Sequence, residues 1–178
     1  NYGRDFMEVV YEVLGEWEAK DFAEVGRWLA SQPWVDGDRM AIQGTSYGGF
    51  MAISTLMRHP GLFKLGIANS PATDWRLYDT IYTERYMWTP QGNTAGYDAG
   101  SAMTYAADLR GRLMLYYGTA DNNVHTTNTM QLIAALQHAG KSFEVQVGPD
   151  RGHSGINPDR MMEFFIQHLV IEAPRTIS

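Results

Sequence analysis

Cysteine is absent from this 178-residue chain, so disulfides, thiolate nucleophiles and cysteine-bound metals are excluded. The apolar runs are too short for a transmembrane helix, which needs about 20 residues. Basic residues are also scarce: 14 Lys and Arg against 20 Asp and Glu give a net charge of −6. The chain therefore lacks the overall positive charge of a nucleic-acid binder, and we expect neither a nucleic-acid partner nor a membrane segment in it.

The first residues contain no initiator Met, and no basic segment followed by an apolar one, so they do not resemble a signal peptide. We expect the chain to begin partway through a longer protein. Hydrophobic residues make up 44% of the chain and charged residues 19%, which is the balance of a packed globular protein. The length suits one domain.

Apolar periodicity predicts alternating helices and strands. Short apolar runs flanked by turn signals predict strands at 40–43, 65–68, 112–117 and 143–147. Helices are expected at 16–31, 48–58 and 127–139 and from Asn157 onward, and residues 70–105 are a long excursion with short helices. The order predicts a mostly parallel sheet with helices on both faces.

Three of these helices have a predicted buried face. The faces comprise Trp17, Phe22, Val25, Trp28 and Leu29 in the first, Met130, Ile133, Ala134 and Leu136 in the third, and Met161, Phe164, Phe165 and Leu169 in the last.

The segment Gly44–Gly49 (GTSYGG) lies between a predicted strand and a predicted helix. A G-x-S-x-G motif in this position is typical of a nucleophile elbow, a strained turn that exposes a serine above the sheet. We expect Gly44 and Gly48 to supply the room that this turn needs. Ser46 is the predicted nucleophile, and the backbone N–H of Tyr47 can stabilise an oxyanion. The alternative interpretation is a tightly packed glycine-rich turn without chemistry.

A serine nucleophile needs a base, and that base needs a carboxylate to orient it. In elbow-bearing sheets the acid and the histidine follow the serine in the chain, in loops after two late strands. Asp121 follows the strand at 112–117, and His153 follows the strand at 143–147. Since the carboxyl ends of parallel strands share one edge of a sheet, we predict that Ser46, Asp121 and His153 form a catalytic triad.

Other titratable residues compete for these roles. Four histidines have structural interpretations: a helix end for His59, a helix cap or supporting position for His125, and solvated helix surfaces for His138 and His168. Asp150 is only three residues from His153 and is the local alternative to Asp121 as its partner.

Three blocks, Gly44–Gly49, Gly118–His125 and Gly152-His153, resemble the catalytic blocks of the prolyl oligopeptidase family of serine peptidases. Residues 70–87 (SPATDWRLYDTIYTERYM) are similar to the dipeptidyl peptidase IV branch of that family. Together the blocks cover nearly the whole chain. The resemblance implies the C-terminal part of an α/β-hydrolase fold, with residues 1–178 forming a partial catalytic domain.

The resemblance also implies a substrate pocket. In that branch the residue before the scissile bond, commonly proline, is held by aromatic side chains. The matching positions here are Tyr47, Trp75, Tyr78 and Tyr82, with Asn123 and Val124 alongside. Aromatic faces bury a compact apolar pyrrolidine ring well, and an asparagine amide can donate to a substrate carbonyl. Judged from the residues alone, the same aromatics are also explained as core.

Three further residues of this segment carry expectations. Ala72 stands where the branch often has a larger aliphatic residue, which predicts a slightly roomier pocket. Glu84 and Arg85 lie among aromatics, so we expect them to form a structural ion pair or hydrogen bonds rather than to contact substrate.

Members of the family carry an N-terminal β-propeller and further upstream strands, including a Tyr that completes the oxyanion hole, and these parts are not in this chain. The strand at 40–43 is then left with an exposed edge, which favours aggregation. We expect residues 1–178 alone to be poorly stable and inactive, and the parent protein to be the active species, a homodimer like many of its relatives.

The predicted function is a serine exopeptidase that cleaves after Pro or Ala near the N-terminus of peptides, releasing dipeptides or tripeptides through an acyl-enzyme. It needs no metal or organic cofactor. Two alternatives stay open: an acylaminoacyl peptidase or esterase on the same fold, and a non-catalytic interaction fragment.

Overall fold

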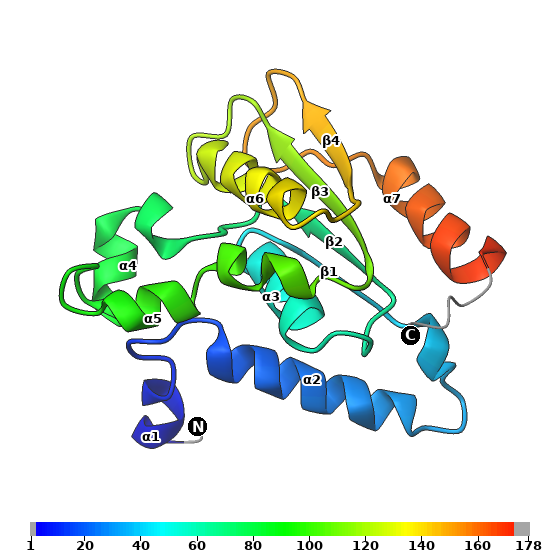
Figure 1. The fold of residues 1–178 in the computed structure, drawn as a ribbon, viewed down its shortest axis with the longest axis horizontal. Coiled ribbons are helices and arrows are strands. Elements are labelled where there is room, and N and C mark those ends of the chain that lie inside the picture. Colours follow the sequence, from blue (N-terminus) through cyan, green and yellow to red (C-terminus); the bar gives the residue numbers. More distant parts are fainter. Residues whose placement is uncertain (1–2, 173–178) are drawn as a thin grey trace.

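The computed structural model describes residues 3–172, whose strands form a four-stranded parallel sheet (Figure 1). In chain order and in spatial order these strands are β1 (Ala41–Thr45), β2 (Leu65–Asn69), β3 (Arg112–Gly118) and β4 (Glu144–Gly148). Each pair of neighbours is parallel, so the chain must cross back over the sheet between strands. The predicted α/β fold with a parallel sheet is confirmed.

The helices precede, connect and follow the strands. They are α1 (Arg4–Glu8), α2 (Glu16–Ala30), α3 (Tyr47–Arg58), α4 (Thr80–Met87), α5 (Thr94–Ala99), α6 (Thr127–His138) and α7 (Pro158–Phe165), which continues as the π-helical segment η4 (Ile166–Ile171). Short 3-10 helices are η1 (Gly37–Arg39), η2 (Trp75–Leu77) and η3 (Ala102–Asp108). The four predicted helices are confirmed, whereas α1 was not expected. Across residues 3–172 the structure contains no helix with the length and hydropathy of a membrane span.

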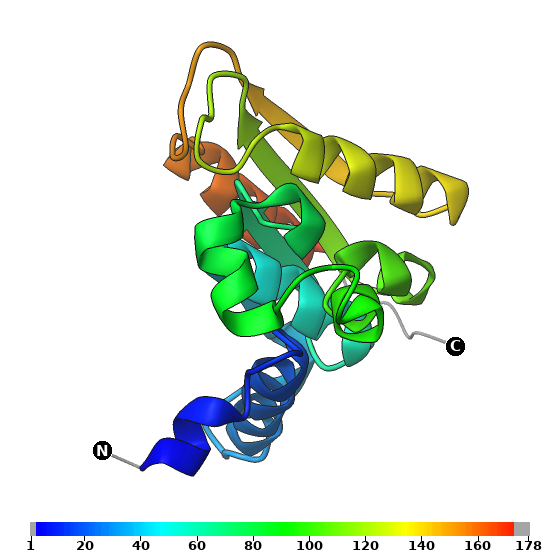
Figure 2. The same cartoon turned by 90° about the vertical axis from the view of Figure 1, so that its left-hand side faces the viewer.

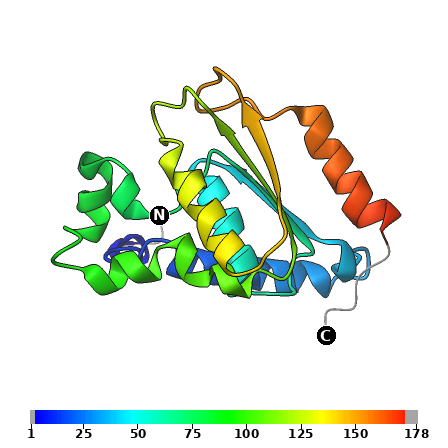
Figure 3. The same ribbon diagram turned by 45° about the horizontal axis from the view of Figure 1, so that its top comes forward.

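Helices cover both faces of the sheet, with α6 and α7 on opposite sides of the strands (Figures 2 and 3). Side chains alternate between the faces along β2. Leu65 and Ile67 pack in one cluster with Phe164 of α7. Ala68 packs on the other face, in a cluster that includes Leu56 of α3 and Leu132 of α6. The two apolar layers hold the strands, and therefore the loops at their carboxyl ends, in fixed positions.

Helix α2 has the predicted length, but the predicted buried face is wrong. Four large side chains expected inside are 46–58% exposed: Trp17, Phe22, Val25 and Trp28. The buried positions are the small residues Ala19, Ala23 and Gly26, and of the expected face only Leu29 packs partly against the core. A Cβ on Gly26 would lie 2.9 Å from Cζ of Phe63, so α2 lies close to its neighbours through its small side chains.

The buried face of α6 agrees only in part with the prediction: Leu136 is buried and Ile133 packs partly against the core, as expected, but Met130 and Ala134 do not. Met130 is 49% exposed and Ala134 is exposed, whereas Leu132 and Leu136 are fully buried. Asn128 is buried on the same i, i+4 stripe, because its side chain accepts the backbone N–H of Thr73 at 3.0 Å. The helix thus buries a polar residue that has a hydrogen-bond partner outside the helix, together with two leucines.

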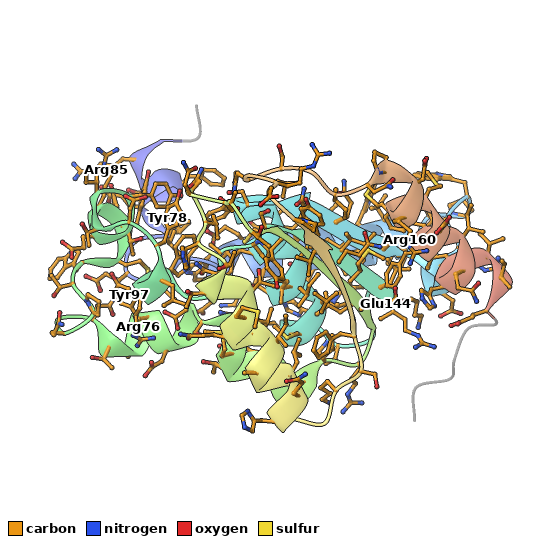
Figure 4. The ribbon with its side chains drawn as sticks, turned by 90° about the horizontal axis from the view of Figure 1, so that it is seen from above. Arg76, Tyr78, Arg85, Tyr97, Glu144 and Arg160 are labelled. Atoms are coloured by element: carbon orange, nitrogen blue, oxygen red, sulfur yellow. The ribbon has the colours of Figure 1, made fainter. Side chains whose placement is uncertain are left out.

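His168 is not the solvated histidine that we expected. Its side chain is only 8% exposed and packs edge-on against Phe164. Nε2 lies 3.4 Å from Oε1 of Glu144, and Nδ1 lies 3.0 Å from Oε2 of Glu172. Arg160 also approaches Glu144, at 3.9 Å, at the end of the molecule where Figure 4 labels both residues. Charged groups thus hold the last helical segment against β4.

Residues 70–105 form the predicted excursion between β2 and β3, which contains η2, α4, α5 and the start of η3. Arg76 lies between Asp74 and Asp98, at 3.2 and 2.5 Å, and its guanidinium lies over the ring of Tyr97 (Figure 4). Each of these two helices begins at a side chain that accepts a backbone N–H of its first turn. The side chain of Asp79 does so for α4, and the side chain of Asn93 for α5. These contacts fix the segment that carries most of the predicted pocket.

Candidate active site

Ser46 lies at the turn between β1 and α3. Its backbone has φ 60° and ψ −121°, a conformation that is sterically unfavourable for a residue with a side chain. Two backbone hydrogen bonds hold it there: Ser46 N–H donates to the carbonyl of Asn69 at 2.9 Å, and Phe50 N–H donates to the carbonyl of Ser46 at 3.0 Å. A strained serine between a strand and a helix is the local geometry of a nucleophile elbow.

The close approach inside this turn explains Gly44. A Cβ on Gly44 would lie 2.2 Å from the carbonyl oxygen of Gly48, so only glycine fits. A Cβ on Gly48 would meet no atom of the described residues within 4 Å. The turn therefore requires a glycine at position 44, and the expected need for room at Gly48 has no counterpart in residues 3–172.

The backbone N–H of Tyr47 begins helix α3. The first N–H groups of a helix have no partner within it and carry part of the positive end of the helix dipole. Across the described residues, this N–H has no hydrogen-bond acceptor. It is therefore available to an oxyanion formed next to Ser46.

Asp121 and His153 lie in contact at the carboxyl end of the sheet. Oδ2 of Asp121 lies 2.9 Å from Nδ1 of His153, and the Asp121 side chain is fully buried. Oδ1 accepts the backbone N–H groups of Asn123 at 2.9 Å and Val124 at 3.0 Å. The alternative acid, Asp150, is exposed, and its backbone N–H donates to the hydroxyl of Thr119. The pair leaves Nε2 on the far side of the imidazole, without a partner in residues 3–172.

The loops that carry Asp121 and His153 are tied to each other. Ala120 N–H donates to the carbonyl of Arg151 at 2.9 Å. A Cβ on Gly118 would lie 2.2 Å from that same carbonyl oxygen, so the two loops touch. Because β3 and β4 are adjacent and parallel, their loops emerge at one edge of the sheet and place the carboxylate against the imidazole.

Tyr47, Trp75, Tyr78 and Tyr82 form one aromatic cluster. Ring centroids are 5.5 Å apart for Tyr47 and Trp75, 6.1 Å for Trp75 and Tyr82, and 5.5 Å for Tyr78 and Tyr82. Trp75 is buried, whereas the three tyrosines are partly exposed. Burial raises the pKa of each of these tyrosines, so the hydroxyls stay protonated at neutral pH. The three tyrosine rings of the cluster are thus partly accessible, and Trp75 joins the cluster to the core.

Asn123 joins the aromatic cluster to the loop of Asp121. The hydroxyl of Tyr78 donates to Oδ1 of Asn123 at 2.8 Å, so the Asn123 NH₂ group is left as a donor. Val124, the next residue of this loop, is buried. Ala72 is buried in the same cluster as Trp75. The six residues of the predicted pocket therefore lie on three segments, which are joined by the contacts of Tyr47 with Trp75 and of Tyr78 with Asn123.

Two predicted structural residues lie elsewhere. Glu84 and Arg85 are exposed on α4, and Arg85 points outward at the edge of the molecule (Figure 4). The expectation that they are buried partners among the aromatics is wrong, because the helix turns its Tyr82 and Tyr86 side inward and this charged pair outward. His125 caps α6, where its Nδ1 lies 3.2 Å from the backbone N of Thr127.

Two supporting residues were not identified from the sequence. Glu18 accepts the hydroxyl of Tyr47, and Asn128 holds the segment before Trp75 through the backbone N–H and side chain of Thr73. The spacing Gly15-x-x-Glu18 indicates an N-terminal helix cap, but a partner 29 residues away leaves no local signal.

Several known proteins are similar to this chain. The model of the prolyl oligopeptidase family matches residues 1–170. A protein of Talaromyces marneffei named "Probable dipeptidyl-aminopeptidase B" is 49% identical over 156 residues, which are 85% of this chain and 17% of that protein. A protein of the same name in Sclerotinia sclerotiorum is 45% identical over 155 residues, with the same two coverages.

The fold is also that of a solved relative. The crystal structure of Porphyromonas gingivalis dipeptidyl peptidase 4 matches with a TM-score of 0.90 and 37% identity, over 94% of this chain and 25% of that one. The fold is thus of the α/β-hydrolase type, and the chain spans only 17% of the length of the curated relatives it matches. The chain belongs to the prolyl oligopeptidase family.

Proposed function

We propose that this chain carries the reaction centre of a serine exopeptidase, which releases dipeptides or tripeptides from the N-terminus of peptides after Pro or Ala. The observation that carries the proposal is the 2.9 Å contact between buried Asp121 and His153, at the carboxyl edge of the sheet where the turn of the strained, partly buried Ser46 also lies. The names of the relatives support the exopeptidase class.

In this reaction Ser46 Oγ attacks the scissile carbonyl while Nε2 of His153 takes its proton. Asp121 accepts Nδ1–H, which fixes the tautomer of His153 and stabilises the imidazolium. The N–H of Tyr47 donates to the oxyanion. His153 then gives the proton to the leaving amine, and water attacks the acyl-enzyme by the same route in reverse.

The aromatic cluster supports the preference for proline. A pyrrolidine ring is compact and apolar, and the partly exposed rings of Tyr47 and Tyr82, which pack on buried Trp75, offer it an apolar wall. The NH₂ group of Asn123, oriented by Tyr78, donates to a substrate carbonyl. A dimer of the parent protein is part of the proposal, supported by the exposed stripe Met162, Ile166 and Val170 on α7 and η4.

A substrate panel tests this function in the full-length protein. Chromogenic Xaa-Pro and Xaa-Ala dipeptides and tripeptides with a free amino end are compared with an N-acetylated dipeptide and a short-chain ester. We expect the Xaa-Pro compound to have the highest kcat/KM among substrates of equal length. Preferential cleavage of the acetylated peptide or the ester would instead select the acylaminoacyl peptidase or esterase.

A further inference from the structure

Glu18 connects the first turn of α2 to the residue next to Ser46. One carboxylate oxygen, Oε1, accepts the hydroxyl of Tyr47. The other, Oε2, accepts the backbone N–H of Gly15 at 3.0 Å. Both oxygens of this partly buried carboxylate therefore have a partner, one from its own helix and one from the candidate site.

The turn that carries Glu18 is itself fixed against the aromatic cluster. Gly15 has φ +94°, and a Cβ there would lie 2.4 Å from Cζ of Phe50. Phe50 in turn packs edge-on against Tyr47 and Trp75, with centroids 5.6 and 5.0 Å away. The backbone N–H of Gly15 thus holds the Glu18 carboxylate next to Tyr47, and the turn at Gly15 packs closely against Phe50.

We propose that Glu18 is a positioning residue, which fixes the ring of Tyr47 and with it the backbone N–H that faces the oxyanion at Ser46. The inference rests on the proposed function, because it assigns Glu18 a role in that same reaction. A hydrogen bond to an ionised acceptor is stronger than one between neutral groups, so Glu18 restricts the rotation of the phenol ring.

The same contact decides what the pocket offers a substrate. The Tyr47 hydroxyl is occupied by Glu18, so the ring presents its face and not its polar end. Burial and the hydrogen bond to Glu18 both raise the pKa of Tyr47, so the hydroxyl remains a donor over the working pH range. The apolar character of this wall thus depends on a charged residue behind it.

The test uses the full-length protein with Glu18→Ala, Glu18→Gln and Tyr47→Phe. Active sites are titrated with a fluorophosphonate, and kcat is expressed per titrated site. We expect Glu18→Ala to lower kcat by roughly tenfold, less than the full loss of an oxyanion donor, with KM changed by less than about threefold. Glu18→Gln retains one acceptor and should recover part of the loss.

A double variant and a matched control variant complete the experiment. Tyr47→Phe should lower kcat as Glu18→Ala does, and the double variant should be no worse than either single variant, because both remove one contact. Glu16→Gln, in the same helical turn, should keep the wild-type kcat and KM, because within residues 3–172 the Glu16 carboxylate pairs with Lys20 alone, at 2.7 Å.

The outcomes separate the inference from the function beneath it. If Glu18→Gln and Tyr47→Phe keep the wild-type kcat per titrated site and lose only thermal stability, Glu18 is merely structural and the inference is wrong. If the folded wild-type protein takes no label at Ser46, the proposed function itself fails. If Glu18→Ala does not fold, Glu18→Gln and Tyr47→Phe still test the role of Glu18.

Discussion

Asp121 has the most constrained side chain of the candidate site. Its two oxygens accept three hydrogen bonds, one from His153 and two from backbone N–H groups of its own loop. Because the side chain is fully buried, each of these donors would be left unpaired if the carboxylate were lost. The loop backbone therefore fixes the Asp121 carboxylate, and this carboxylate fixes the imidazole of His153.

Asp121→Asn is expected to lower kcat by about four orders of magnitude while the fold is kept. The amide has one acceptor oxygen in place of two, so either His153 or the loop backbone then faces an NH₂ group and the tautomer of His153 is no longer held. The measurement is kcat on the best peptide substrate, with circular dichroism to verify folding.

Asp150→Asn is the matched control, because this exposed residue shares the loop of His153 and makes no contact with its ring. We expect wild-type activity. Equal losses from the two substitutions would contradict the assignment of Asp121.

At the scale of elements, the end of the chain described here is held by charge. Hydrogen bonding to His168 lowers the pKa of Glu172 to about 2, and Arg112, 3.1 Å away, acts in the same direction. These contacts join the end of η4 to β3 and, through Glu144, to β4. The docking of this segment should therefore depend on pH.

Because the pKa of Glu172 is lower in the folded state than its ordinary value of 4.5, its ionised form stabilises the docked segment above that pH. The contribution is lost as the pH falls from there towards 2. We expect hydrogen-exchange protection factors of the η4 amides to fall over this range in the wild-type protein. In Glu172→Gln they should already be low at pH 5 and change little.

The control for this experiment is Glu163→Gln, which removes an exposed carboxylate of α7 whose partner in the described part of the chain is Arg160. Its protection factors should follow the wild type. Wild-type protection in Glu172→Gln at pH 5 would show that the charge on Glu172 does not hold the segment.

The elements themselves were predictable because local signals specify them. Turn residues bound the short strands, and Gly44 and Ser46 mark the elbow between β1 and α3. The directions of the faces were not predictable from local pattern alone. In α2 the large side chains are exposed and Ala19 is buried, because close helix packing selects the small side of the helix.

Long-range polar contacts account for the remaining differences in the elements and the site. The buried side chain of His168 contacts Glu144, which is 24 positions away in sequence. Glu18 meets Tyr47 across 29 positions. By contrast, Asp121 and His153 were paired from the sequence because each follows a strand of one parallel sheet, which fixes where their loops emerge.

At the scale of the whole molecule, two apolar surfaces lack a partner within residues 3–172. β1 pairs only with β2, so its other edge is open. The side of α2 that bears Trp17, Val25 and Trp28 is about half exposed. An open strand edge and an exposed apolar helix surface both favour association between chains.

We propose, therefore, that residues 1–178 purified alone do not unfold cooperatively, bind a hydrophobic dye such as ANS, and cleave no peptide. Size-exclusion chromatography and thermal denaturation of this segment, beside the full-length protein, test the proposal. A monomeric, cooperatively folded segment with peptidase activity would contradict it.

Whether Ser46 is an activated nucleophile is tested most directly by labelling the folded full-length protein with a fluorophosphonate and mapping the modified residue. We predict stoichiometric modification of Ser46, and none in Ser46→Ala. An unlabelled Ser46, or a label on another serine, would contradict the peptidase mechanism and favour a non-catalytic interaction protein on this fold.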